Sequence, residues 1–228
     1  METGRKGQAS LIEKADSYIW DTGPQSAFLA GYTKSHLNGD VAPDMKKALF
    51  FTRRDFGVGW MNQDHGPDVK LIDKPGRYEC DGLFSRREGL LLVVRTADCM
   101  PLILYSQDEG AAGVIHMGWR SAHKGILDNI GFDLSSFICV AGVGLRKCCY
   151  EVGEEFLKFD GMKYFVEKRE GSYYFDSIGF ARSRLSARGL DEDNFFDQGE
   201  CSYCSARGFH SFRRTKARGR TLSFVMKY

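Results

Sequence analysis

The sequence contains no long hydrophobic run. Its best apolar stretch, residues 90–94, is broken by Arg95, whereas a membrane-spanning helix needs about 20 apolar residues. The first twenty residues are interrupted by charged side chains and show no apolar centre of a signal peptide. We therefore expect a cytoplasmic protein with no membrane partner.

An excess of charge of either sign is also missing. The 32 lysines and arginines nearly balance the 30 acidic residues, which leaves a formal net charge of +2. Such a balance gives no overall attraction to nucleic acid. One basic run, residues 213–220, looks like a nucleic-acid patch when it is taken alone.

The cysteine content does not suggest a disulfide framework. An odd number of cysteines without a signal peptide favours reduced thiols or metal ligands. The seven cysteines are Cys80, Cys99, Cys139, Cys148, Cys149, Cys201 and Cys204. The last four could complete a four-cysteine zinc site, but the adjacent pair has poor ligand spacing and a lone Cys-x-x-Cys is weak evidence.

The length and the 43% hydrophobic content suit one domain with a substantial core. Short segments rich in β-branched or aromatic residues predict strands at 28–33, 59–62, 90–95, 101–105, 111–116, 137–141, 173–175 and 221–226. Helices are expected at 43–56, at 122–132, after Tyr150 and at 177–188. Because strands and helices do not strictly alternate, a mixed-sheet α+β domain is favoured over a doubly wound fold.

One predicted β-hairpin carries chemistry-bearing residues. Two apolar strands flank a short polar turn, and Tyr105 can pair across it with Ala111 or with Ala112. Only the second pairing places Cys99 and His116 on one face, as diagonal neighbours. The sequence leaves both registers open.

A thiol and an imidazole on one face could hold a metal ion. Zinc binds nitrogen and sulfur at about 2.0–2.3 Å, and His65, at a strand end, is the obvious third ligand. Three protein ligands would leave a position for water or substrate, as a catalytic zinc requires. Asp98 either orients a ligand histidine or has a structural role. The spacing also allows a plain interpretation, in which Cys99 is a core residue and the histidines are hydrogen-bonded structural groups.

Several motifs in a fixed order resemble those of one family. Thr96-Ala97-Asp98-Cys99 before Pro101, and His116 before Gly118-Trp119-Arg120, are similar to its TADCxP and HAGWRG signatures. Further matches are Gln63-Asp64-His65-Gly66, Asp81-Gly82-Leu83, Gly142-Val143-Gly144, Tyr150-Glu151-Val152, Asp176, Cys201, Ser211-Phe212-Arg213-Arg214 and Gly219-Arg220. On these residues the chain is identified as a member of the YfiH-like family, also called the multicopper polyphenol oxidase or laccase-domain family.

Three positions depart from the family pattern. Ser121 stands where the family usually has glycine, Met117 where it has alanine, and Asp64 where it has valine. None removes a candidate ligand, but Asp64 and Ser121 could alter the walls of the site. The resemblance covers residues 27–228, which we assign to the domain, and leaves 1–26 as an N-terminal extension that we expect to be partly flexible.

The resemblance implies a single domain of mixed β-sheets packed as a sandwich and flanked by helices. It implies that His65, Cys99 and His116 are the metal ligands and catalytic residues, with Zn2+ as the cofactor and Cu2+ as the alternative. Family members are associated with phosphorolysis of purine nucleosides and with deamination of adenosine, so we expect a nucleoside and phosphate as ligands.

Phosphate needs fixed cations with suitable donors. The candidate substrate- and phosphate-binding residues are Gln63, Arg120, Arg213, Arg214 and, more weakly, Arg54. Because the basic run 213–220 coincides with the family's SFRR and GR positions, we expect no nucleic-acid partner.

Two other functions remain open. A hydrolase could use Cys99, activated by His116 or His65, to attack amide bonds such as those of cell-wall precursors. A copper-dependent polyphenol oxidase is implied by the family's older name, but several coppers need many histidines. This chain has five, namely His36, His65, His116, His123 and His210. Neither the preferred purine nor the oligomeric state follows from the sequence.

Overall fold

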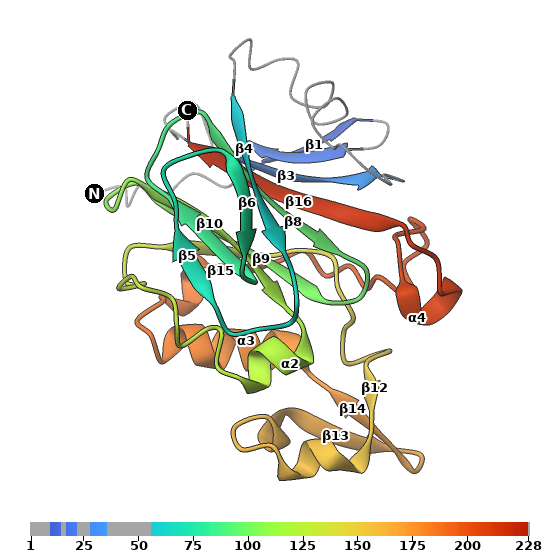
Figure 1. Cartoon of the computed structure of the whole chain (residues 1–228). Helices are drawn as coiled ribbons and strands as arrows, with labels where there is room; N and C mark the ends of the chain where they lie inside the picture. The colour runs from blue at the N-terminus through green and yellow to red at the C-terminus, as the bar shows by residue number, and fades with distance from the viewer. Residues whose placement is uncertain (1–9, 15–16, 22–27, 36–55, 228) are drawn as a thin grey trace, which may run out of the picture.

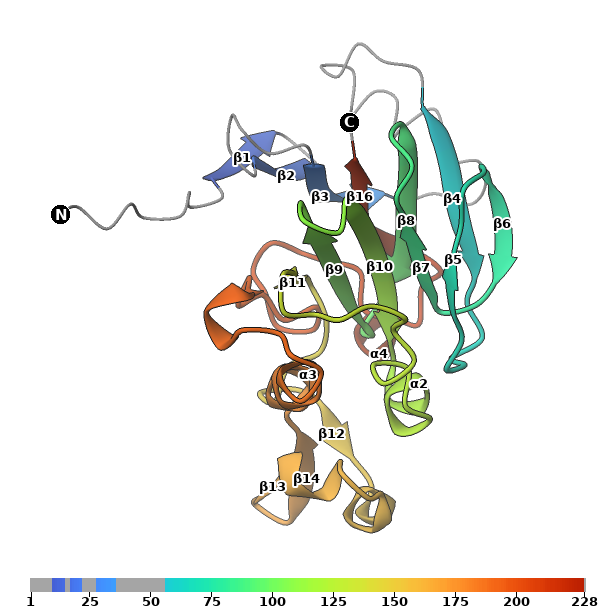
Figure 2. The ribbon, with the colours of Figure 1, turned by 90° about the vertical axis from the view of Figure 1, so that its left-hand side faces the viewer.

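The computed structural model describes residues 10–14, 17–21, 28–35 and 56–227, and two packed β-sheets form its main body (Figures 1 and 2). The first sheet has, among these residues and in spatial order, β1 (Ser10–Lys14), β2 (Ser17–Asp21), β3 (Phe28–Ser35), β16 (Arg220–Lys227), β8 (Leu90–Thr96), β4 (Gly57–Asn62) and β6 (Gly76–Glu79). The second has β15 (Phe195–Asp197), β11 (Ile138–Ala141), β9 (Met100–Ser106), β10 (Ala111–Met117), β7 (Gly82–Ser85) and β5 (Val69–Leu71).

Both sheets are mixed. In the first, β4 runs parallel to β8 and β6, whereas the pairs from β1 to β8 are antiparallel. In the second, β11 is parallel to β15 and β5 is parallel to β7. A third sheet at the lower end of Figure 1 is formed by β12 (Glu151–Val152), β14 (Ser172–Phe175) and β13 (Val166–Arg169).

Helices are short in the described part of the chain. The α-helices are α2 (Trp119–His123), α3 (Ser177–Ser186) and α4 (Phe212–Thr215), and the 3-10 helices are Glu154–Lys158, Lys163–Phe165 and Glu192–Asn194. The side chain of Asp176 caps α3 by accepting a hydrogen bond from the backbone N–H of Gly179. None of the helices in these described ranges has the length and apolar character needed to cross a membrane.

The apolar run in β8 is explained by burial on both faces of the first sheet. Leu92 and Val94 pack between the two sheets, together with residues of β9 and β10. Leu91 and Val93 point the other way and pack with Phe224 of β16. A strand covered on both sides needs no polar alternation, which is why residues 90–94 resemble a continuous apolar run.

The outer face of the second sheet is covered by helices. Leu102 and Leu104 of β9 share a cluster with Phe180 and Leu185 of α3, and Figure 2 shows α2 and α3 beneath this sheet. The expected class, an α+β domain with mixed sheets packed as a sandwich and flanked by helices, is therefore confirmed.

Each of the eight expected strands overlaps an observed one, and the helix at 177–188 is confirmed as α3. The helix expected at 122–132 is wrong, because α2 begins earlier, at Trp119, and ends at His123. Gly125 then adopts a φ of 84°, which turns the chain out of the helical path. The segment after Tyr150 forms β12 and then a 3-10 helix. The expected helix at 43–56 lies almost entirely outside the described residues.

The boundary at residue 27 stays a prediction. Within the stretch assigned as an extension, β1 and β2 pair with each other, and β2 continues onto β3 of the first sheet.

Candidate metal centre and its cavity

The observed hairpin register places Cys99 and His116 together. Tyr105 pairs with Ala112 and His116 pairs with Pro101, which is the second of the two registers that the sequence left open. Cys99 lies directly before β9, and side chains two residues apart share a face of a strand. The pairing of β9 with β10 therefore brings the imidazole of His116 next to the thiol of Cys99. The side chain of His116 is buried, with 4% of its surface exposed.

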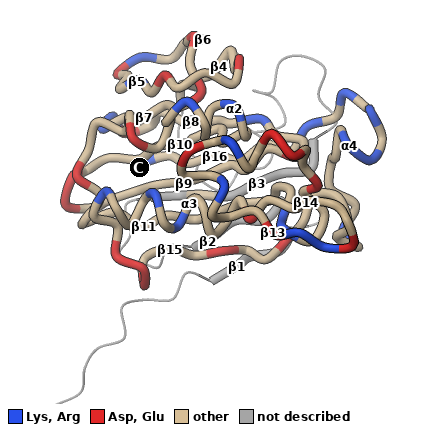
Figure 3. Tube along the Cα trace, turned by 90° about the horizontal axis from the view of Figure 1, so that it is seen from below, with Lys and Arg blue, Asp and Glu red and all other residues tan. Residues whose placement is uncertain are grey.

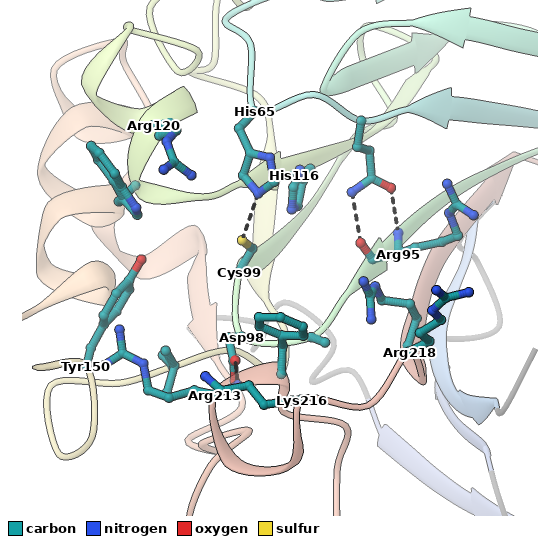
Figure 4. Close-up of a pocket in the computed structure, with 16 residues that line it drawn as sticks. His65, Arg95, Asp98, Cys99, His116, Arg120, Tyr150, Arg213, Lys216 and Arg218 are labelled. Carbon is teal, nitrogen blue, oxygen red and sulfur yellow. Dashed lines mark hydrogen bonds between the residues drawn. The ribbon is translucent and has the colours of Figure 1, made fainter. Parts of the chain in front are cut away.

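His65 reaches the same point from the loop after β4. Its Nε2 lies 3.6 Å from Sγ of Cys99, and its ring meets that of His116 edge-on, with 4.8 Å between centroids (Figure 4). One ligand atom from each of the three residues lies within 4.8 Å of the other two. At zinc bond lengths, two ligand atoms on one tetrahedral ion are roughly 3.3–3.8 Å apart. The donor types and their spacing therefore fit a single metal ion.

The carboxylate of Asp81 organises this cluster. Asp81 is completely buried, and its Oδ1 lies 2.5 Å from Nδ1 of His116. The same carboxylate accepts hydrogen bonds from the backbone N–H groups of Asp64, His65 and Gly66, at 3.0–3.2 Å. Since Asp81 occupies Nδ1, Nε2 is the nitrogen of His116 left for a metal. Asp81 stood in a matching motif, but nothing in its spacing assigned it this role.

The electrostatics of the cluster favour a charged thiolate. Burial raises the pKa of Cys99, but hydrogen bonds and charge from His116 and His65 outweigh burial and lower it to about 6. Burial lowers the pKa of His116, whereas Asp81 and Cys99 raise it to about 9. Without metal at neutral pH, Cys99 is therefore a thiolate beside an imidazolium. The thiolate is the form that binds metal or attacks carbon.

The turn after β10 leaves room for two of the candidate ligands, His65 and Cys99. A Cβ on Gly118 would lie 2.7 Å from Cδ2 of His65 and 3.0 Å from Sγ of Cys99, so this position requires glycine. Ser121, which departs from the family pattern, is completely buried. Its Oγ accepts a hydrogen bond from N–H of Gly118 and donates one to the carbonyl of His116, both at 3.0 Å. Ser121 therefore fastens the turn and does not line the cavity.

Asp98 has contacts of a structural kind. Its backbone φ is 94°, an uncommon conformation for a residue with a side chain. Its carboxylate accepts hydrogen bonds from Oγ of Ser202, at 2.9 Å, and from N–H of Arg213, at 2.7 Å. Of the two roles that the sequence left open, these contacts match the structural one, because Asp98 ties the segment before β9 to the loop before α4 and to α4 itself.

A cavity of about 1010 Å³ opens in front of His65, Cys99 and His116 (Figure 4). Among the described residues that line it, one is acidic, Asp98, whose carboxylate is already hydrogen-bonded. The cations that line it are Arg95, Arg120, Arg213, Lys216, Arg218 and Arg220. Figure 3 shows lysine and arginine gathered along the chain at α4. So much positive charge on one concave surface favours an anionic ligand.

The positive charges are close enough to affect one another. Burial, followed by repulsion from Arg77 and Arg220, lowers the pKa of Arg95. An anion placed between such groups would relieve this repulsion. The cavity therefore offers electrostatic stabilisation beyond that of any single arginine.

Aromatic rings form other parts of the cavity wall. Trp119, Tyr150 and Phe212 line it. The guanidinium of Arg120 lies 4.7 Å from the centre of the Trp119 ring, and that of Arg213 lies 5.5 Å from the Tyr150 ring. A neighbouring cavity of about 520 Å³ shares Trp119, Tyr150 and Arg213. Flat rings beside cations suit a ligand that carries both a planar base and a charge.

The candidate substrate residues do not all meet at this cavity. Gln63, Arg120 and Arg213 line it. Both ends of the Gln63 amide bond to the backbone of Arg95, at 2.8 and 3.0 Å, so Gln63 joins β4 to β8 at this point.

Arg214 lies outside the group of residues that line the cavity. Its guanidinium donates to the carbonyls of Ser202, Tyr203 and Phe209, which holds this loop together. Arg54 falls outside the described residues.

Sequence reasoning missed four of the lining cations, Arg95, Lys216, Arg218 and Arg220. Three of them belong to the basic run 213–220, which was the available signal. Lys216, the residue directly after α4, has a φ of 57°, so the chain turns there and later residues of the basic run also line the cavity.

Fold and site together define a class of domain, a two-sheet sandwich with a candidate metal site of one cysteine and two histidines at a cation-lined cavity. Residues 40–227 match the family described as multi-copper polyphenol oxidoreductase laccase. The chain belongs to this family.

Known proteins of this kind are similar along most of the chain. The purine nucleoside phosphorylase of Deinococcus radiodurans is 32% identical over 177 residues, covering 73% of this chain and 68% of that protein. The purine nucleoside phosphorylase of Aquifex aeolicus is 31% identical over 167 residues, covering 69% and 76%. The crystal structure of Bacillus licheniformis hypothetical protein YfiH matches with a TM-score of 0.81 at 19% identity, over 96% of this chain and 99% of that one. The resemblance to the YfiH-like family is confirmed, and the structural match shows a shared fold.

Proposed function

We propose that this chain is a zinc-dependent purine nucleoside enzyme that cleaves adenosine or inosine with phosphate and also deaminates adenosine. The observation that carries the proposal is the position of His65, Cys99 and His116 in the wall of a cavity lined by cations and aromatic rings. The names of the similar phosphorylases support the same substrates. We place the activity in the cytoplasm.

The cations and rings suit the requirements of phosphorolysis. A phosphate oxygen attacks C1′ of the ribose, the bond from C1′ to N9 breaks, and the purine takes up its electrons and a proton. Arg120 and Arg213, with Lys216, would hold the phosphate and compensate its charge. Trp119 and Tyr150 would offer flat surfaces to the purine.

His65, Cys99 and His116 would hold the zinc ion through two nitrogens and one sulfur. When bound in such a site, zinc lowers the pKa of water enough for attack on C6 of adenine, from which ammonia leaves. Asp81 keeps the ring of His116 oriented and its proton on Nδ1. Imidazole and thiolate also bind copper, and metal analysis distinguishes the two ions.

A cysteine hydrolase is the second candidate, because one specific observation favours it. The pKa of Cys99 is lowered to about 6, and its Sγ lies 3.6 Å from Nε2 of His65. An activated thiolate beside a histidine is the arrangement required for nucleophilic attack on an amide. A multicopper oxidase is less well supported, because several copper ions need several groups of histidine ligands. Among the described residues, one group that could hold a metal contains histidine.

The test measures metal and products on the same protein. Metal content is determined after purification without added metal, and release of free base and of inosine from adenosine is followed with and without phosphate. We expect zinc near one equivalent at this site, phosphate-dependent base release, and loss of both in Cys99→Ala and His116→Ala. His123→Ala is the matched control, because His123 lies outside the cluster and packs on Phe159. Zinc-loaded protein that yields neither product while it cleaves an amide substrate would overturn the proposal in favour of the hydrolase.

A further inference from the structure

A second group of residues that could hold a metal consists of four cysteines, and none of them lines the cavity. Cys148 and Cys149 belong to the turn before β12, and Cys201 and Cys204 belong to the loop after β15. Their sulfur atoms all lie within 4.8 Å of one another, and those of Cys148 and Cys204 are 3.8 Å apart. A disulfide would require about 2.05 Å, and all four residues are free thiols.

We propose that Cys148, Cys149, Cys201 and Cys204 form a second, structural zinc site. Four sulfurs at about 2.3 Å from a tetrahedral zinc ion are roughly 3.8 Å from one another, which is the spacing of Cys148 and Cys204. On binding, the thiols release their protons to solvent and each sulfur donates an electron pair to Zn2+. No atom changes its oxidation state.

Cys148 and Cys149 are adjacent in sequence, which is poor spacing for two ligands of one metal ion, but the local backbone geometry allows it. Neighbouring side chains point to opposite faces in a strand, but residues 147–149 form a turn. The N–H groups of Cys149 and Tyr150 both donate to the carbonyl of Arg146, at 2.8 Å. The chain is therefore tightly curved here, and both sulfurs can approach one point.

The second pair of cysteines is also held in a turn. The N–H of Ser205 donates to the carbonyl of Cys201 at 3.1 Å, which closes a turn around the Cys-x-x-Cys segment. Cys201 and Cys204 therefore lie at the two ends of one turn, and both sulfurs can approach the same point.

Contacts between the two turns assemble the cluster. Gly144 forms a parallel bridge with Cys201, and its carbonyl accepts a hydrogen bond from N–H of Ser202 at 3.0 Å. The buried guanidinium of Arg146 bonds to the carbonyl of Glu200 and pairs with the carboxylate of Asp197. These contacts are independent of metal, so the four thiols are brought together by the fold itself.

The cluster is directly connected to the wall of the main cavity. Tyr150 follows Cys149 and lines that cavity. Ser202 follows Cys201 and donates to Asp98, which precedes the ligand Cys99. A zinc ion here would therefore fasten two segments of the cavity wall at a distance from the reacting groups.

Zinc content, measured by mass spectrometry on variants of the whole chain, tests this proposal. We expect Cys204→Ser and Cys148→Ser to lose one zinc per chain that His116→Ala retains. Cys204→His is expected to keep it, because imidazole also binds zinc. Cys139→Ala is the matched control, since this thiol is buried in β11 outside both clusters. Substitution of Co2+ gives a second measurement, because thiolate-to-cobalt absorption should fall in Cys204→Ser.

The proposal is overturned if Cys204→Ser and wild type contain equal zinc, or if protein purified under reducing conditions carries a disulfide among these four residues. Circular dichroism establishes that each variant is folded. The assignment does not depend on nucleoside turnover, so an inactive wild-type protein that loses one zinc in Cys204→Ser still supports it.

Discussion

Oδ1 of Asp81 lies 2.5 Å from Nδ1 of His116, and the same carboxylate accepts the backbone N–H of His65. One buried group thus positions two of the three candidate ligands, one in β10 and one in the loop after β4. Loss of these contacts would leave buried polar groups unsatisfied, because Asp81 is completely buried. The alignment of the candidate ligands therefore depends on a residue that is not itself a candidate ligand.

Asp81→Asn is expected to weaken zinc binding by roughly 10–100-fold, the usual effect of removing a group that orients a ligand histidine. The amide keeps the shape but loses the charge that holds His116. Competition with a chelator measures the affinity. Asp68→Asn is the control, because it removes an exposed carboxylate from the loop that carries His65. Equal affinities in the two variants would show that Asp81 does not position the site.

Alkylation of Cys99 in metal-free protein should show its lowered pKa. The thiolate predominates above a pKa of about 6, whereas an unperturbed cysteine ionises near pH 8.5. The alkylation rate should therefore rise with pH, reach half its maximum near pH 6 and level off by pH 7.5. Peptide mass spectrometry follows Cys99 separately from the other thiols. Urea-unfolded protein should have its midpoint near 8.5, and added zinc should protect Cys99. A folded-state midpoint at pH 8 or above would refute this account.

Gly118→Ala is expected to reduce metal affinity by roughly tenfold or more, because the added methyl group would displace His65 or Cys99. Far-ultraviolet circular dichroism should remain that of the wild type. Gly131→Ala is the matched control, since a Cβ there meets nothing within 4 Å. If both variants bind zinc like the wild type, the ligands have more room than this geometry allows.

Arg120 and Arg214 belong to two of the matching motifs, and only Arg120 lines the cavity. Arg120→Ala should raise the KM for phosphate roughly tenfold with a smaller effect on the KM for nucleoside, because Arg120 lines the cavity. Arg214→Ala should leave the phosphate KM near that of the wild type and lower the thermal midpoint, because its guanidinium holds backbone carbonyls. Steady-state kinetics and a melting curve separate the two effects. An unchanged phosphate KM in Arg120→Ala, with a raised one in Arg214→Ala, would exclude Arg120 from phosphate binding.

The sequence predicted the strands well because each combines β-branched or aromatic residues with nearby turn residues. It could not choose between the two hairpin registers, since both keep an apolar face, and the pairing of Tyr105 with Ala112 emerges only from the assembled sheet. The expected helix at 122–132 failed for a local reason, the left-handed conformation of Gly125. An apolar pattern does not reveal that conformation.

The candidate ligands could be named from motifs, but the residues that position them could not. Asp81 acts through contacts with residues 64–66 and 116, which adjoin it only in the fold. Arg213 and Arg214 are adjacent and chemically identical, and both donate to backbone carbonyls, yet only Arg213 also lines the cavity. Side-chain direction at the short helix α4 decides between them, and residue type carries no information about it.

The position of β16 has a consequence for synthesis on the ribosome. Residues 220–227 lie between β3 and β8 and pair with both, so the first sheet cannot be completed before these residues have emerged. Until then Leu91 and Val93 of β8 lack the apolar cover that Phe224 and its neighbours provide. Nascent chains of this length with uncovered apolar strands are prone to aggregate and are typical clients of chaperones. Truncation before Arg220 should therefore yield an aggregating or degraded product, and not a smaller folded protein.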